Sequence, residues 1–274
     1  MFVVFGMPRS GTTLVAQCLN GHSQLLVPDE TDFLVPAAHA FRRIDDEEVG
    51  RRFLGELICA TDRYEATLGR WLEPDRVKAV IAEAPYRFDA VVASLYDALA
   101  EAAGVALAGD KSPNDLPQSE ILGQAGFFTE RIRAVHLVRD PRDVMISMAR
   151  LGWLNGIDVS YARLWRNANL NLHRRLADQP DRYLLIRYED VVADAAASFE
   201  RVADFLGVPF EPAMVTEEAR FSQFPEHKGM TQHASTFRPI GGDSVGRYAE
   251  LFDTSTLDEV QRLAGDALAT FGYP

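Results

Sequence analysis

The stretch that most constrains the fold is residues 1–17, MFVVFGMPRSGTTLVAQ. Four apolar residues run into a glycine, a short polar loop follows, and a helical pattern begins after the loop. This order predicts a strand, a turn and a helix N-terminus, where backbone N–H groups and the helix dipole favour an anion. Gly6 and Gly11 have the spacing of the phosphate loop G-x-x-x-x-G-K-[ST], but Thr12 replaces its lysine. The missing lysine argues against nucleoside triphosphate chemistry and leaves a shorter phosphate group, or an ordinary glycine-rich turn, open.

The composition limits the classes of partner. The chain has 274 residues, 47% of them hydrophobic and 25% charged, with a formal net charge of −12. That charge argues against non-specific binding to nucleic acid or to an anionic membrane, so an anionic ligand must meet local arginines. A span of about 18 apolar residues and a signal segment are both missing from the sequence, and two cysteines are too few for a disulfide framework. We therefore expect a cytoplasmic protein without a membrane span.

Short apolar runs alternate with helical patterns along the chain. This alternation predicts one α/β domain over residues 1–274, with a central, mainly parallel sheet flanked by helices. A helical insertion is expected at about 29–104 and a long loop at about 221–247. The predicted strands are residues 2–5, 105–108, 134–138 and 183–186. The predicted helices are residues 12–19, 47–59, 88–103, 140–149, 161–176, 195–206 and 256–271, with a further one beginning within 28–43.

Cations follow three of the predicted strands. In open α/β sheets, ligands gather at the carboxyl ends of the strands. Arg9, Lys111 and Arg139 each lie just past such an end, which favours a ligand with several negative charges.

The segment HLVRDPRDVMISMARL, residues 136–151, strengthens this expectation. Arg139 ends a strand, and Ser147 lies eight residues later, about two turns into the next helix. An arginine fork and a hydroxyl together suit a phosphate group. By itself, R-D-P-R is more typical of a salt bridge at a helix start. It supports a phosphate site only in combination with the loop that follows the first strand.

Together, PRSGTT after the first strand and VRDPRDVMIS after a later one resemble the sulfotransferases that use 3′-phosphoadenosine 5′-phosphosulfate (PAPS). RYEDVVAD and FERVADFLGVP are also similar to that family, so the resemblance covers nearly the whole chain. It implies that Arg139 and Ser147 hold the 3′-phosphate. Sulfuryl transfer has no γ-phosphate for a loop lysine to reach. The loop residues implied to hold the 5′-phosphosulfate are Arg9, Ser10, Gly11, Thr12 and Thr13.

The resemblance also implies the catalytic residues. The cytosolic branch has a histidine two positions after the second-strand lysine, but Pro113 stands there in this chain. The layout resembles the tyrosylprotein sulfotransferase branch, whose arginine-to-glutamate spacing of 21 is that of Arg9 and Glu30. Glu30 is therefore the expected base, Lys111 the cation at the bridging oxygen, and Arg9 part of the catalytic set. The alternative is that Asp29 and Glu30 open a helix.

The late part of the chain resembles the loop that covers the cofactor in this family. Within HKGMTQHASTFRPIGGDSVGRY, the resemblance implies that Ser235 and Arg238 contact phosphate. Tyr188 is expected beside the adenine, and its alternative is a core tyrosine at a strand end.

The expected reaction moves a sulfuryl group from PAPS to a hydroxyl of a small-molecule, lipid or carbohydrate acceptor. It leaves 3′,5′-adenosine bisphosphate (PAP) and requires no metal. Trp71, Trp153 and Trp165 could line an apolar acceptor pocket or belong to the core. The sequence leaves open whether the chain forms a homodimer. The alternative functions are a kinase-like phosphotransferase with Asp110 as a metal ligand, and a non-catalytic nucleotide-binding protein of the same fold.

Overall fold

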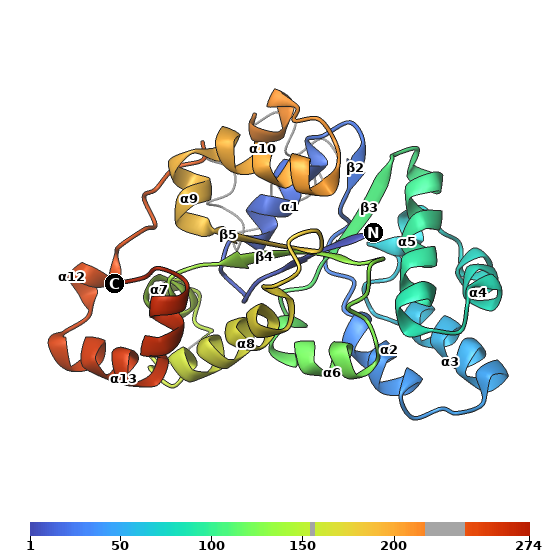
Figure 1. Cartoon of the computed structure of the whole chain (residues 1–274), viewed down its shortest axis with the longest axis horizontal. Helices are drawn as coiled ribbons and strands as arrows, with labels where there is room; N and C mark the ends of the chain where they lie inside the picture. Colours follow the sequence, from blue (N-terminus) through green and yellow to red (C-terminus); the bar gives the residue numbers. More distant parts are fainter. Residues whose placement is uncertain (154–156, 217–238) are drawn as a thin grey trace.

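A five-stranded sheet forms the centre of the computed structural model, which describes residues 1–153, 157–216 and 239–274 (Figure 1). The strand order is β2-β3-β1-β4-β5, and every neighbouring pair is parallel. This sheet confirms the predicted α/β class. The strands are β1 (Phe2–Phe5), β2 (Leu25–Leu26), β3 (Leu107–Lys111), β4 (Arg133–Val138) and β5 (Tyr183–Arg187). The two residues of β2 escaped prediction because so short a run carries no periodicity.

The central strand β1 is apolar on both sides because helices cover both faces of the sheet. Phe2 and Val4 belong to one buried cluster, whereas Val3 and Phe5 belong to the other. The ring of Phe2 lies against Gly109 of β3, where an added Cβ would come within 2.4 Å of the ring. A side chain at position 109 would therefore push β1 and β3 apart.

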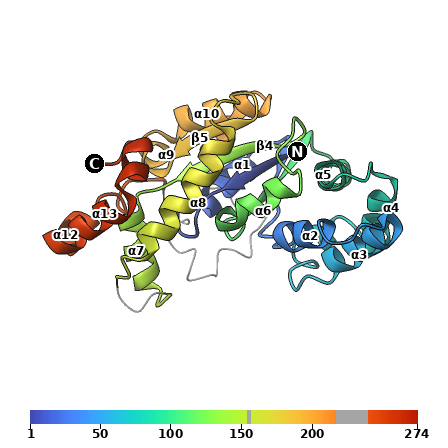
Figure 2. The same ribbon diagram turned by 60° about the horizontal axis from the view of Figure 1, so that its bottom comes forward.

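Two helical layers enclose the sheet (Figures 1 and 2). Helices α1, α9 and α10 lie over one face, and α6, α7, α8 and α13 lie on the other side. The short α12 follows residues 239–247 near α7. The bounds of these helices are α1 (Thr12–Asn20), α6 (Ser119–Gln124), α7 (Pro141–Arg150), α8 (Tyr161–Leu176), α9 (Tyr188–Ala193), α10 (Ala195–Leu206), α12 (Tyr248–Leu251) and α13 (Thr254–Thr270). Within the described ranges, every helix is too short or too polar to cross a bilayer.

The predicted insertion is helical and packs beside the β2–β3 edge of the sheet (Figure 2). Helices α3 and α5 begin and end where the sequence predicts. Helix α4 was missed, although Pro74 stands at its first position and Val77, Val80 and Ile81 bury one face. The insertion helices are α2 (Leu34–Phe41), α3 (Glu47–Cys59), α4 (Pro74–Glu83) and α5 (Phe88–Ala103). Single 3₁₀ turns occur at Leu68–Arg70, Leu116–Gln118 and Pro212–Val215.

Candidate active site

The loop between β1 and α1 presents unpaired donors to one side of the molecule. The backbone turns through left-handed conformations at Arg9 (φ 69°) and Gly11 (φ 101°). No described side chain caps helix α1, so within the described part of the chain the N–H groups of its first turn stay available. The Ser10 hydroxyl is buried and has no hydrogen-bond partner among the described residues. These donors suit an anion such as a phosphate or a phosphosulfate.

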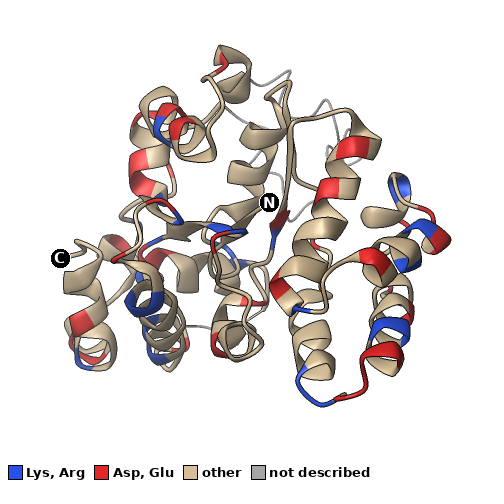
Figure 3. Cartoon of the chain, turned by 45° about the vertical axis from the view of Figure 1, so that its right-hand side comes forward, with Lys and Arg blue, Asp and Glu red and all other residues tan. Residues whose placement is uncertain are grey.

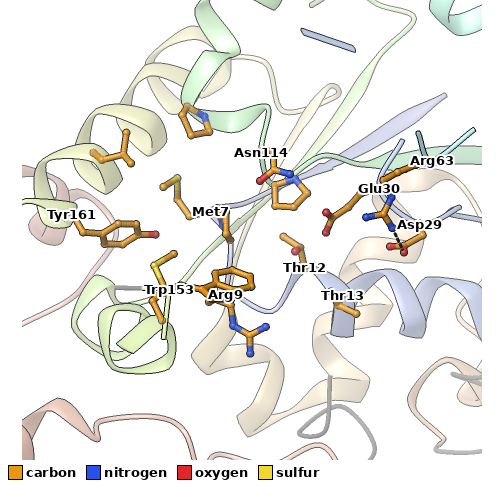
Figure 4. Close-up of a pocket in the computed structure, with 15 residues that line it drawn as sticks. Met7, Arg9, Thr12, Thr13, Asp29, Glu30, Arg63, Asn114, Trp153 and Tyr161 are labelled. Carbon is orange, nitrogen blue, oxygen red and sulfur yellow. Dashed lines mark hydrogen bonds and ion pairs between the residues drawn. The ribbon is translucent and has the colours of Figure 1, made fainter. Parts of the chain in front are cut away.

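A cavity of about 670 Å³ opens beside this loop, a size typical of small-molecule sites (Figure 4). Its wall combines the loop, the segment before α2, the insertion, and helices α7 and α8. Glu30, Asp29 and Arg63 lie on one side of the cavity in Figure 4, and Tyr161 lies on the other. The lining residues are Met7, Pro8, Arg9, Thr12, Thr13, Asp29, Glu30, Arg63, Pro113, Asn114, Pro117, Met148, Trp153, Tyr161 and Leu164.

Lys111 lies behind Asp29 and Glu30, outside the described lining of the cavity, and is 2% exposed. Its Nζ donates to Oδ1 of Asp29 at 2.9 Å and to Oε1 of Glu30 at 3.0 Å. Burial works against its charge, but the two carboxylates raise the pKa of Lys111 above its ordinary value. The structure therefore brings the predicted catalytic pair together, with Lys111 as a cation and Glu30 at the cavity surface.

Asp29 is a site residue that sequence reasoning did not assign. Besides Lys111 it contacts Arg63, whose Nη2 lies 2.5 Å from Oδ2 of Asp29. The alternative in which Asp29 and Glu30 open a helix is wrong, because α2 begins at Leu34 and has no acidic residue in its first turn. Arg63 comes from the insertion, and no motif in the sequence links it to Asp29.

Both flanks of the Asp29–Glu30 pair are anchored. Asn20, at the end of α1, exchanges two hydrogen bonds with the backbone of Val27, at 2.7 and 2.8 Å. On the other flank, the Thr31 hydroxyl donates to the buried Asp110 carboxylate at 3.1 Å. These contacts fix the backbone on either side of the carboxylates, so Glu30 faces the cavity without belonging to a helix or strand.

Asp110 does not fit the alternative of a metal ligand. Its carboxylate is fully buried, accepts hydrogen bonds from Thr31 and Ser112, and is absent from the described cavity wall. Nearby Asp115 is also buried, and burial together with the charge of Asp110 raises the pKa of Asp115 to about 8. Asp115 is therefore mostly protonated at neutral pH. Thus Asp110 anchors the segment that carries Glu30.

Arg139 and Arg9 lie together at the other end of the loop. Arg139 donates to the carbonyl oxygens of Arg9 at 3.0 Å and of Ser244 at 2.8 Å. Its own carbonyl accepts from Nε1 of the buried Trp165 at 3.0 Å, which fixes the strand end. Burial, and then the charge of Arg139, lower the pKa of Arg9. Two guanidinium groups held so close favour an anion between or beside them.

The predicted partner of Arg139 has a different contact in this structure. The Ser147 hydroxyl accepts from Nε of Arg9 at 3.2 Å. Arg139 keeps its Nε buried without a hydrogen-bond partner among the described residues. The three residues lie in one corner, and the 3′-phosphate clamp remains a prediction.

The R-D-P-R motif divides between two roles. Asp140 caps α7 by accepting from the backbone N–H of Arg142 at 2.9 Å, and the two side chains also form a buried ion pair. That half of the motif is the helix-start salt bridge named as the ordinary alternative. Arg139 points back to the loop instead.

Tyr188 packs on the loop, at the first position of α9 rather than inside the core. An added Cβ on Gly11 would come within 2.5 Å of the Tyr188 ring, so position 11 requires glycine for space as well as for φ. The Arg139 guanidinium lies 4.2 Å from the ring centroid, and the hydroxyl lies 2.9 Å from Oγ of Ser244. Ser235 and Arg238 lie outside the described residues.

The three tryptophans have different environments. Trp153 lines the cavity, with the Arg9 guanidinium 5.6 Å from its ring centroid. Trp165 is fully buried in the core, and Trp71 packs partly buried against it. Of the three tryptophans considered for an apolar acceptor pocket, Trp153 lines the described cavity, whereas Trp71 and Trp165 belong to the core.

Charge is distributed unevenly over the fold. Figure 3 shows acidic and basic residues on the outer helices, and further basic residues near the centre of the molecule. With a net charge of −12, an anionic ligand depends on local cations such as Arg9 and Arg139.

The chain belongs to the sulfotransferase family, because the model of that family matches residues 2–212. It is 25% identical to rat sulfotransferase 2A1 over 171 residues, which are 53% of this chain and 59% of the relative. It is 27% identical to mouse carbohydrate sulfotransferase 5 over 167 residues, which are 52% of this chain and 42% of the relative. The chain thus spans about half the length of these curated relatives.

Solved structures share the fold over the whole chain. The sulfotransferase domain from the Synechococcus PCC 7002 olefin synthase matches with a TM-score of 0.67 and 26% identity, covering 100% of this chain and 94% of that one. Mouse sulfotransferase SULT7A1 complexed with PAP matches with a TM-score of 0.52 and 14% identity, covering 98% and 84%. At that identity the second likeness concerns the fold.

Proposed function

We propose that the chain transfers a sulfuryl group from PAPS to a hydroxyl group of an acceptor. The observation that carries this proposal is the buried Lys111, held between Asp29 and Glu30 at the edge of a cavity beside an uncapped anion loop. Membership of the sulfotransferase family supports it, and so does the PAP bound by the mouse relative of the same fold.

The residues present fit the donor. The free hydroxyl of Ser10, the uncapped N–H groups of α1, and the neighbouring Arg9 and Arg139 match a nucleotide with phosphate at two positions. When bound, PAPS supplies a sulfur atom whose bond to the leaving phosphate breaks as a bond to the acceptor oxygen forms. We assign the 5′-phosphosulfate to the loop residues Arg9, Ser10, Gly11, Thr12 and Thr13, and the 3′-phosphate to Arg139 and Ser147.

Glu30 takes the proton that the acceptor hydroxyl loses. Its carboxylate lies at the cavity surface, and its Oε1 accepts a hydrogen bond from Nζ of Lys111 at 3.0 Å. Asp29 is the weaker candidate for the base because two cations, Lys111 and Arg63, already hold its two oxygens. The charge of Lys111 stabilises the negative charge that grows on the leaving phosphate.

These roles require no metal ion, since proton transfer and charge stabilisation come from side chains. The cytoplasmic location and the homodimer stay predictions from the sequence.

The test is transfer of ³⁵S from labelled PAPS to a mixture of alcohols, run with excess chelator. We expect the label in an organic sulfate ester together with one equivalent of PAP, and no turnover of ATP with Mg²⁺. A chain that leaves PAPS intact and transfers phosphate from ATP to the same alcohols would be a phosphotransferase. A chain that binds PAP but turns over neither donor would be the non-catalytic nucleotide-binding protein.

A further inference from the structure

The cavity has two chemically different halves. Its polar half contains Asp29, Glu30 and Arg63, and Figure 4 places these side chains together on one side. The opposite half, formed by the loop and by the segments around α7 and α8, is mainly apolar, and its charged side chain among the described residues is Arg9, whose guanidinium lies over the Trp153 ring. The members of this apolar half are Met7, Pro8, Pro117, Met148, Trp153, Tyr161 and Leu164.

The apolar half continues onto the protein surface. Trp153 is 53% exposed and Leu164 is 47% exposed, yet both line the cavity. Ile157, between them in the sequence, is also exposed. Single exposed apolar residues need no explanation, but large ones that continue a binding cavity mark a surface that an apolar ligand covers.

Tyr161 provides one polar atom in this half. The residue is 7% exposed, and its hydroxyl has no hydrogen-bond partner within the described part of the chain. In Figure 4 the Tyr161 side chain extends from α8, and its oxygen points toward Met7, which also lines the cavity. A buried hydroxyl without a partner is unfavourable, so a ligand oxygen placed there would gain a hydrogen bond that the free protein lacks.

We propose that the acceptor is an amphiphilic alcohol with an extended apolar body that carries one further oxygen. Its reacting hydroxyl lies at Glu30, its carbon chain lies along Met148 and Leu164, and its second oxygen accepts from the Tyr161 hydroxyl. This inference rests on the proposed sulfuryl transfer.

A carbohydrate fits this half poorly. Each sugar hydroxyl that leaves water without a protein partner costs free energy, and the polar side chains described in this half are Tyr161 and Arg9. An alkyl chain loses nothing there and gains from leaving water. The lining chemistry therefore selects the apolar body.

The first experiment compares three acceptors with labelled PAPS. Nonanol and 6-ethoxyhexanol have chains of equal length, but the second carries an ether oxygen far from its hydroxyl, as the opposite positions of Glu30 and Tyr161 require, and methyl glucoside represents the carbohydrates. We expect kcat/KM to be highest for 6-ethoxyhexanol, about tenfold lower for nonanol, and lowest for methyl glucoside. A preference for methyl glucoside, or no transfer to either alkyl alcohol, would overturn the inference.

Variants then locate the effect on the wall. Leu164→Asn should lower kcat/KM for both alkyl alcohols about tenfold, because it places an amide on the apolar face. Leu251→Asn is the matched control, since Leu251 has a similar exposure of 53% and lies outside the described cavity wall. Equal losses in the two variants would contradict the placement of the chain.

Tyr161→Phe tests the second oxygen. It should remove the preference for 6-ethoxyhexanol over nonanol, because kcat/KM should fall about tenfold for the ether and by a smaller factor for nonanol. A preference that survives the substitution would show that Tyr161 does not contact the acceptor.

Binding of PAP separates this inference from the proposed function. Tight PAP binding with transfer to methyl glucoside alone would leave the sulfotransferase proposal standing and remove the amphiphilic acceptor. Failure to bind PAP at all would remove the proposed function itself.

Discussion

The two sides of the cavity are built in different ways. The side that we propose for the cofactor comes mainly from backbone: the end of β1, the first turn of α1, and the end of β4 with Arg139. The acceptor side comes from side chains on separate segments, such as Arg63 in the insertion and Tyr161 at the start of α8. Backbone sites require particular residues at fixed spacing, whereas a side-chain wall tolerates many compositions. The first side is therefore common to a family, and the second can differ from one member to another.

The sharpest test of this contrast is Glu30→Gln, which changes the boundary between the two sides. If Glu30 is the base, the rate of transfer should fall about 10²- to 10⁴-fold, because the amide cannot take the acceptor's proton. PAP affinity should change little, since the loop and Arg139 hold the nucleotide. Single-turnover rates and calorimetric titration of PAP measure the two effects.

Asp29→Asn is the matched control for that change. It alters the neighbouring carboxylate, which also contacts Lys111, but it leaves the proposed base in place. We expect the smaller loss of the two variants. A larger loss in Asp29→Asn than in Glu30→Gln would reverse the roles of the two carboxylates.

A second change acts within the cofactor side. Arg139→Ala should weaken PAP binding by about 1.5–3 kcal/mol, the scale of a hydrogen bond to a charged group. Affinity for 5′-AMP should fall much less, because that nucleotide has no 3′-phosphate. Equal losses for the two nucleotides would place Arg139 at the 5′-phosphate, and an unfolded variant would make it a structural residue.

Asp115 is buried near Asp110, on the carboxylate side of the cavity, and its titration should be visible in the stability of the protein. The pKa of Asp115 is about 8 in the folded chain, whereas the ordinary value, taken for the unfolded chain, is 3.8. Between pH 3.8 and pH 8 the folded chain therefore keeps a proton that the unfolded chain has lost. The stability due to the neutral carboxyl is complete below pH 3.8 and is lost as the pH rises through 8.

Between pH 5 and pH 8 the wild type should lose on the order of 3–4 kcal/mol of stability through this carboxyl, and Asp115→Asn should remove that loss. Urea unfolding of wild type and variant at both pH values measures the difference. Asp181→Asn, at an exposed position, is the control and should keep the loss of the wild type. The same change in both variants would mean that Asp115 titrates as an ordinary surface carboxyl.

The smallest expected effect concerns Tyr188. Tyr188→Phe removes the contact between its hydroxyl and Ser244 but keeps the ring that packs on Gly11 and Arg139. PAP affinity should fall by less than about 1 kcal/mol, the net value of one neutral hydrogen bond. Tyr188→Ala should weaken PAP binding more, since it removes the ring. Equal effects would show that the ring does not support the nucleotide.

The sequence predicts the backbone-built part of the molecule well, for physical reasons. Strand β1 and helices α3, α5, α8 and α10 begin and end where the apolar periodicity predicts, because each buries a face against the sheet or a neighbouring helix. The loop motif also predicts the strand, turn and helix that the structure shows at β1 and α1, whereas the anion bound there stays a prediction. Lys111 and Glu30 were predicted as a pair through the family resemblance, and the structure brings them within 3.0 Å.

The remaining parts of the site depend on contacts between distant segments. Asp29 and Arg63 are 34 positions apart, and no spacing rule links a loop to an insertion. From the sequence, Tyr161 is predicted as the first residue of an amphipathic helix. The structure is needed to show that its hydroxyl has no hydrogen-bond partner among the described residues. Ser147 was paired with Arg139 by spacing, but Arg9 reaches it in the structure.

The most direct measurement of the central claim compares PAP with 5′-AMP on the wild-type chain. A ligand that binds the native state alone stabilises it by RT ln(1 + [L]/Kd), so thermal unfolding reports both affinities. The account predicts that PAP raises Tm much more than 5′-AMP at equal concentration, without added metal, because Arg139 and Arg9 provide a second anion site beside the loop. Equal shifts with the two nucleotides would contradict it.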